Sequence, residues 1–142
     1  MSAEYQLEQD INHAIIEFYE RLSSWEQSVV RDQGVSLAQI HTVEILGANG
    51  SMRMKELADK LGITTGTLTV QVDRLVKTGL VVRQPSANDR RSVEVQLTEK
   101  GQQMFVEHDQ LHLQLTREMT SGLEPQECQQ LLRFLTRLNG TF

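Results

Sequence analysis

The first thirty residues carry a regular stripe of apolar side chains. Within residues 4–31, its members are three or four positions apart, which is the spacing of one face of an α-helix. The pattern therefore predicts one long amphipathic helix, followed by Gly34. The stripe consists of Leu7, Ile11, Ile15, Phe18, Leu22, Trp25 and Val29.

Three shorter helices are predicted next. Ser36 followed by Gln39 is typical of a capping box, which places the start of the second helix. Helical spacing then predicts a short helix at about 54–61 and another at about 65–78, joined by a turn that contains glycine. The positions expected to face inward are Leu37, Ile40, Val43, Leu46, Leu57, Ala58, Leu61, Leu68, Val72, Leu75 and Val76.

After Gly79 the apolar period changes from 3.6 to 2 residues. Residues 80–84 and 93–97 read as strands, the second with Val93, Val95 and Leu97 on one buried face, and the polar residues between them favour a turn. A long helix is expected at about 99–120. A last one starts near Pro125, a residue favoured at the first helical position. The order predicts a mainly α-helical fold with a small β-hairpin, a winged helix-turn-helix.

Composition limits the function classes. The chain has 142 residues, enough for one domain with a real core, and its single cysteine, Cys128, excludes an intramolecular disulfide. We find no membrane span and no leader, so a cytoplasmic location without membrane partners is expected. No nucleophile–base motif, phosphate loop or pair of catalytic acids is recognisable, so neither an enzyme nor a cofactor is expected.

The net charge of −5 is unevenly distributed. Residues 51–100 hold nine basic and six acidic residues and carry +3, while the remainder carries −8. A polyanion responds to the local field within roughly a Debye length, about 8–10 Å, so a basic middle segment is compatible with DNA binding. Chance segregation of charge is the alternative explanation.

Two short helices joined by a glycine-containing turn are typical of a helix-turn-helix, whose second helix enters the major groove of DNA. The helix at 65–78 begins with small hydroxyl-bearing residues, which allow close approach to phosphate at the positive end of the helix dipole. Thr64 alone is better explained as a cap. The DNA contacts predicted for this segment are Thr64, Thr65, Thr67, Thr69, Val70 and Arg74.

The hairpin tip, Asn88-Asp89-Arg90-Arg91, presents two adjacent arginines on a turn. Such groups pair with phosphates or enter a narrow minor groove. Asp89 is spaced to hold Arg91 by a charge-assisted hydrogen bond, which would orient its guanidinium. A generic solvated hairpin is the alternative. Directly after a helix-turn-helix, we interpret Asp89, Arg90 and Arg91 as DNA-binding residues.

At these positions the sequence resembles the MarR family of transcriptional regulators. The resemblance is carried by the runs Met54–Ile63, Thr67-Leu68-Thr69, Asp73–Val81, Asn88–Ser92 and Leu97–Gly101. The Asp-x-Arg hairpin followed by Leu-Thr is its most specific part. The resemblance extends over essentially the whole chain, because the long helices on either side of the helix-turn-helix also match the family pattern.

The resemblance implies a homodimer held by the first and last two helices, which would also cover their apolar stripes. It implies two recognition helices in successive major grooves of a pseudo-palindrome, Arg91 in the minor groove, and release by a small ligand, a metal or oxidation. One domain, 1–142, would then combine a DNA-binding lobe at 35–98 with dimerisation helices at 1–34 and 99–142. Many relatives carry a longer polar or basic side chain where this chain has Val70, so the base specificity of the family is not carried over to this protein.

The candidates for a regulatory switch are weaker. His108 and His112 are spaced i, i+4, a spacing that can bind one metal ion, and His41 is a third candidate. A metal-sensing regulator of this fold is therefore one alternative, and a winged-helix module that binds protein is another. We favour instead a small-molecule effector in a pocket lined by Trp25, His41 and Phe105. In this interpretation His41 is a packed polar residue, and Cys128 is a buried thiol of the core.

Overall fold

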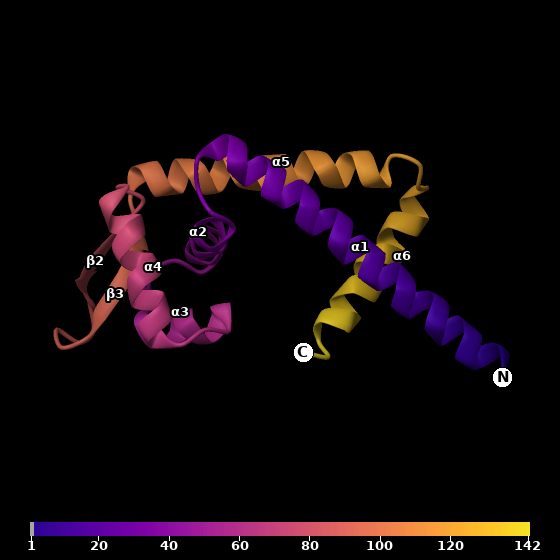
Figure 1. The fold of residues 1–142 in the computed structure, drawn as a ribbon, viewed down its shortest axis with the longest axis horizontal. Coiled ribbons are helices and arrows are strands. Elements are labelled where there is room, and N and C mark those ends of the chain that lie inside the picture. Colours follow the sequence, from indigo (N-terminus) through magenta and orange to yellow (C-terminus); the bar gives the residue numbers. More distant parts are fainter. Residues whose placement is uncertain (1) are drawn as a thin grey trace. The chain divides into compact units, whose positions relative to one another are not determined.

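The protein, described here by a computed structural model of residues 2–142, comprises two compact units. The first extends to Gln102 and the second from Gln103 to Phe142. The predicted fold class is confirmed, since the described chain is mainly helical with one small three-stranded sheet (Figure 1). The elements are α1 (Ala3–Gln33), α2 (Leu37–Asn49), β1 (Met52–Arg53), α3 (Met54–Leu61), α4 (Thr65–Lys77), β2 (Val81–Pro85), β3 (Val93–Leu97), α5 (Glu99–Thr120) and α6 (Pro125–Asn139).

Capping side chains define where the helices begin. The Ser36 hydroxyl accepts a hydrogen bond from the Gln39 amide at 3.1 Å, and the Gln39 side chain accepts one from the Ser36 amide at 2.8 Å. This reciprocal pair is the predicted capping box at the start of α2. Gly34, with φ of 75°, closes α1 in the left-handed region where a side chain would be strained.

The sheet has three antiparallel strands in the order β1-β3-β2. The hairpin pairs Val81 with Leu97 at its base and Pro85 with Val93 near its tip. The sequence analysis did not predict β1, which pairs Met52 with Val95. Two residues are too few to show an alternating pattern, so only the fold reveals this strand.

The core of the first unit lies between α2, α3, α4 and the sheet. Most of the predicted inward positions are buried, and the fully buried side chains include Ile40, Val43, Leu57, Leu68, Val72, Leu75, Leu80, Val81 and Val95. Two predictions were wrong. Val76 is 38% exposed because it lies one helical step beyond the face that Leu75 defines, and Val93 is 46% exposed because it pairs near the hairpin tip.

The second unit contains α6 and all of α5 beyond Gln102. Pro125 occupies the start of α6, as predicted, and Glu124 and Glu127 form a capping box there. None of the α6 residues is buried. Among the described residues, no helix combines the length and apolar character needed to cross a membrane.

Candidate nucleic-acid interface

The helix-turn-helix consists of α3, a tight turn and α4. Gly62 ends α3 with φ of 69°, and its amide donates to the Asp59 carbonyl oxygen at 3.2 Å. The Ile63 amide donates to the Ala58 carbonyl oxygen at 3.1 Å, which closes the turn. Since α4 buries Leu68, Val72 and Leu75 against the core, its other face is left to solvent.

The start of α4 is ordered by its threonines. The Thr64 hydroxyl accepts a hydrogen bond from the Thr67 amide at 3.2 Å and donates one to the Thr67 hydroxyl oxygen at 3.0 Å. Thr64 is therefore the N-cap, as its position suggested. The Thr69 hydroxyl donates to the Thr65 carbonyl oxygen at 2.8 Å, so its proton is already used within the helix.

The exposed face of α4 carries apolar, acidic and basic side chains. Val70 is 52% exposed, and Arg74 is also exposed. Asp73 accepts a hydrogen bond at 2.5 Å from Arg83 of β2. The sequence analysis missed this contact because the two residues belong to different elements.

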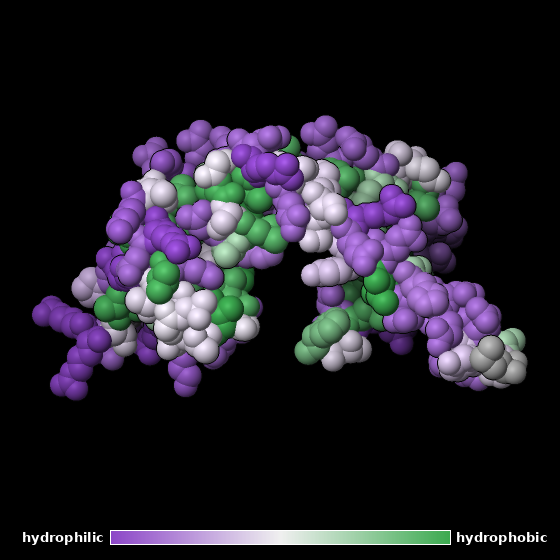
Figure 2. Space-filling model, in the orientation of Figure 1, coloured by the Kyte–Doolittle hydropathy of each residue, from purple (hydrophilic) through white to green (hydrophobic). Residues whose placement is uncertain are grey.

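The tip of the hairpin is organised by Asp89. Its Oδ1 accepts a hydrogen bond from the Arg91 backbone amide at 2.9 Å, and its Oδ2 accepts one from the Ser92 hydroxyl at 3.3 Å. The predicted bond between Asp89 and the Arg91 guanidinium was therefore wrong, because the carboxylate is used to close the turn. Arg90 and Arg91 are exposed on the loop between β2 and β3, which protrudes as a hydrophilic extension in Figure 2.

The base of the loop is held by Ser86, which is 4% exposed. Its hydroxyl donates to a Glu94 carboxylate oxygen at 3.0 Å and accepts from the Asn88 amide at 3.3 Å. Its amide donates to the Ser92 carbonyl oxygen at 2.8 Å. These bonds, together with those of Asp89, leave the two arginines on a turn with a defined backbone.

The first turn of α5 is fastened to the end of α4. Thr98 donates to the Gly79 carbonyl oxygen at 2.5 Å, and the Lys100 ammonium donates to the Thr78 carbonyl oxygen at 2.9 Å. Gly101 packs so closely on Leu80 that an added Cβ would overlap the Leu80 carbonyl oxygen. We call the residues Thr98, Lys100 and Gly101 the α5 clamp. They fix the C-terminal end of the exposed helix of the helix-turn-helix.

Comparison with known proteins fits this geometry. The model of the MarR family matches residues 35–93, which include the helix-turn-helix and the loop with Asp89 and the two arginines. A relative, the HTH-type transcriptional regulator YfiV of Bacillus subtilis, is 35% identical over 106 residues. The chain belongs to the MarR family. The alignment covers 72% of this MarR-family chain and 66% of YfiV, so the chain spans just under two thirds of that relative.

Solved structures of related proteins agree with the assignment to the MarR family. Streptococcus pneumoniae FabT, solved in complex with DNA, superposes with a TM-score of 0.84 at 24% identity, covering 94% of this chain and 95% of that one. At that identity the likeness establishes the fold. NadR, solved in complex with 4-hydroxyphenylacetate, superposes with a TM-score of 0.74 at 26% identity, covering 90% and 91% of the two chains.

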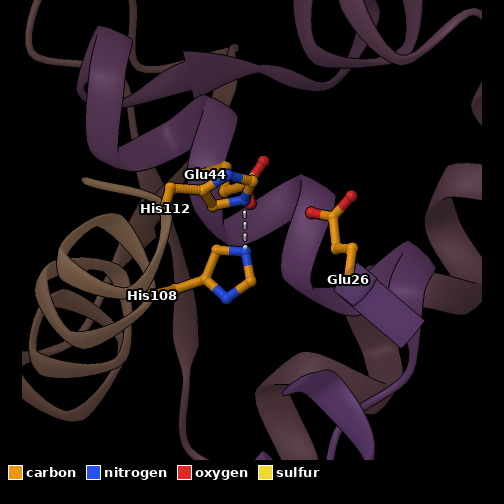
Figure 3. Close-up of side chains that lie close together, drawn as sticks. All are labelled: Glu26, Glu44, His108 and His112. Carbon is orange, nitrogen blue, oxygen red and sulfur yellow. Dashed lines mark hydrogen bonds between the residues drawn. The ribbon is translucent and has the colours of Figure 1, made fainter. Parts of the chain in front are cut away.

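The histidines singled out in this MarR-family sequence have defined partners. His108 and His112 of α5 approach each other with 3.1 Å between their Nε2 atoms (Figure 3), and His108 is fully buried. His41 of α2 lies in the first unit with its Nε2 3.4 Å from a Glu26 carboxylate oxygen. The His41 side chain is 43% exposed, and the residue as a whole is half-buried.

The remaining candidates lie on the long helices. Trp25 of α1, Phe105 of α5 and Cys128 of α6 are all half-buried. Figure 3 also includes two carboxylates of the first unit that the sequence analysis did not name, Glu26 of α1 and Glu44 of α2, whose oxygens lie within 4.8 Å of each other. The effector pocket predicted from Trp25, His41 and Phe105 stays a prediction.

Proposed function

We propose that this MarR-family protein is a sequence-specific, double-stranded DNA-binding transcriptional regulator. It would act as a homodimer on a pseudo-palindromic operator and repress by occupying it. The observation that carries the proposal is that the exposed face of α4 and the loop between β2 and β3 belong to one rigidly connected unit. The helix is suited to the major groove of DNA and the loop to the minor groove. Binding, rather than catalysis, is its activity.

The DNA contacts follow from the exposed groups. The N-terminal turn of α4 would enter the major groove, with Thr65 and Thr67 near phosphates and the methyl groups of Thr69 and Val70 near thymine. Arg74 would meet the backbone beside the groove. Arg90 and Arg91 would reach phosphates or the adjacent minor groove, where the negative potential is enhanced.

Dimerisation is supported by apolar surface on the long helices. On α6, residues with large apolar side chains stay between 38% and 69% exposed, although such side chains gain about 1.5–3 kcal/mol each when fully buried. A two-fold partner would cover these side chains and separate two α4 helices by about one turn of DNA, roughly 34 Å. The exposed set is Tyr5, Leu7, Ile11, Ile15, Ile16, Phe18 and Tyr19 on α1, and Leu131, Leu132, Phe134, Leu135 and Leu138 on α6.

A small organic effector is proposed as the signal that releases DNA. NadR, a protein of the same fold, binds 4-hydroxyphenylacetate in its solved complex. Trp25, His41 and Phe105 supply aromatic and hydrogen-bonding groups of the kind that recognise an aromatic acid, and each is half-buried.

A metal-responsive regulator is the second candidate function. The observation that favours it is the imidazole pair of His108 and His112, with Nε2 atoms 3.1 Å apart on adjacent turns of α5. Two histidines at this spacing can supply two of the ligands of a zinc ion. In this case zinc, rather than an organic acid, would change the affinity for DNA.

The test of the proposed function is direct. Purified protein is mixed with sheared DNA from its own genome, and the retained fragments are sequenced and then titrated as labelled duplexes by fluorescence anisotropy. We expect one or a few pseudo-palindromic fragments to bind at least about a thousandfold more tightly than random duplex. Uniform, weak binding to all duplexes, or none at low salt, would refute a sequence-specific regulator.

A further inference from the structure

Arg83 of β2 and Asp73 of α4 form an ion pair between two elements that face DNA in the proposed function. A guanidinium nitrogen of Arg83 donates to Asp73 Oδ1 at 2.5 Å. The side chain of Arg83 is 33% exposed and that of Asp73 is 53% exposed. The pair therefore joins the exposed helix of the helix-turn-helix to the first strand of the hairpin.

The direction of the Arg83 side chain follows from the strand register. Arg83 lies opposite Val95 in the antiparallel ladder, and residues directly opposite each other project from the same face of a sheet. Val95 is fully buried, so this is the face that packs on the core. Arg83 consequently leaves the sheet on its helix-facing side and reaches along it to α4, instead of projecting freely into solvent.

Asp73 occupies an unusual place for an acid. It lies three residues after Val70, on the same exposed face of α4. In the proposed complex this face meets a polyanion, and a carboxylate without a partner would be repelled by phosphates. The contact with Arg83 neutralises the carboxylate and also restrains the angle between α4 and β2.

We propose that Arg83 is a positioning residue for DNA recognition, and that it acts through Asp73 rather than by contacting phosphate. The proposal rests on the proposed function. Exposed ion pairs contribute little to the stability of a free protein. Close to DNA, where water is partly excluded, the same pair matters more, because breaking it leaves an acid against the phosphates and loosens the hairpin relative to α4.

A double-mutant cycle tests this assignment. Wild type, Arg83→Ala, Asp73→Ala and the double variant are titrated against the retained operator and against random duplex, between 50 and 200 mM salt. Each single variant should bind the operator about tenfold more weakly, with a smaller loss on random duplex. In the Asp73→Ala background, adding Arg83→Ala should change operator affinity less than twofold and leave the salt dependence unaltered.

The opposite results would overturn the proposal. If Arg83 contacts phosphate, Arg83→Ala will lower affinity in the Asp73→Ala background too, and the slope of log K against log salt will fall by about 0.9. If Asp73 merely repels DNA, Asp73→Ala will bind more tightly than wild type. Arg83→Lys keeps a cation able to reach Asp73 and should bind within about threefold of wild type.

Controls distinguish the positioning role of Arg83 from an effect on protein folding and from failure of the proposed function. Arg74→Ala removes a neighbouring exposed arginine of α4 for which the described residues show no ion pair, and it should lower the salt slope in either background. Urea unfolding should give Arg83→Ala a stability close to that of wild type, and Arg83→Gln provides a second variant with a longer side chain. Absence of duplex binding by the wild type would refute the proposed function itself, a result distinct from every outcome of the cycle.

Discussion

The hydroxyl of Thr98 donates a hydrogen bond of 2.5 Å to the carbonyl oxygen of Gly79, and this contact joins α5 to the end of α4. The same hydroxyl accepts from the Gly101 amide at 3.1 Å, so one side chain both caps α5 and holds the neighbouring chain. Lys100 adds its bond to the Thr78 carbonyl oxygen, where a cation is favoured by the helix dipole. The α5 clamp thus holds the C-terminal end of α4, the helix that would read DNA in the proposed function.

The first prediction concerns Gly101. Gly101→Ala should destabilise the protein by about 1–3 kcal/mol, because its Cβ would overlap the Leu80 carbonyl oxygen and backbone must move to relieve it. Urea unfolding measures the change. Gly122→Ala is the matched control, since a Cβ there meets nothing within 4 Å. Equal stabilities of the two variants would show that the clamp is loose.

The second prediction concerns Arg91. Arg91→Ala should weaken operator binding by about 1–3 kcal/mol and reduce the salt slope by about one. The side chain is exposed at the hairpin tip and free to reach DNA. Arg117→Ala, in the last turn of α5, removes an equal charge far along the sequence and should have no such effect. Wild-type affinity of the Arg91 variant would contradict the proposed role of the hairpin.

The third prediction concerns Asp89 and the direction in which its loss changes the affinity for DNA. Asp89→Ala removes a negative charge near DNA, yet it should weaken binding by about 1 kcal/mol, because the turn loses its bonds to the Arg91 amide and the Ser92 hydroxyl. Asp89→Asn keeps one acceptor oxygen, so its affinity for DNA should lie between those of the wild type and the alanine variant. Tighter binding of the alanine variant in anisotropy titrations would mean that Asp89 only repels phosphate.

The fourth prediction concerns dimerisation. Leu135 of α6 is 46% exposed and lies near the middle of the apolar face of its helix. Leu135→Lys should raise the dimer dissociation constant at least about a hundredfold, because each of two symmetric sites loses roughly 1.5–3 kcal/mol of apolar burial. Sedimentation equilibrium measures this, with Gln129→Lys on the polar side of α6 as the control. An unchanged dimer constant would place the interface elsewhere.

The fifth prediction distinguishes the two proposed signals. For a metal-responsive regulator, one equivalent of zinc should change operator affinity, EDTA should reverse the change, and His112→Ala should abolish it. His13→Ala, on the exposed face of α1, is the control. Identical titrations with zinc and with EDTA would remove this candidate and leave the organic effector.

Local signals explain why much of the fold was predictable. The capping box at Ser36 and Gln39, the glycine after each helix and Pro125 at the start of α6 act within one turn of chain, so the sequence specifies them without reference to the rest of the fold. The boundaries of α3 and α5 accordingly lie where the periodicity placed them.

Contacts between elements were not predictable in the same way. The two residues of β1 gain their conformation only from pairing with β3, and the bond between Asp73 and Arg83 depends on how β2 passes α4. The Asp89 carboxylate had two possible partners two residues away, a guanidinium and an amide, and the tightness of the turn selected the amide. Whether the predicted threonines and arginines contact DNA stays a prediction.

Because the α5 clamp joins α5 to the end of α4, a movement of the first turn of α5 would also move α4. Because α4 has 13 residues, it is about 20 Å long, and it is gripped at its C-terminal end while Thr65 lies at the other. A tilt of about 5° around the gripped end displaces the Thr65 end by roughly 2 Å, more than the distance range over which a hydrogen bond survives. In the proposed function, a small rotation of the first turn of α5 would thereby be amplified into the loss of base contacts by α4.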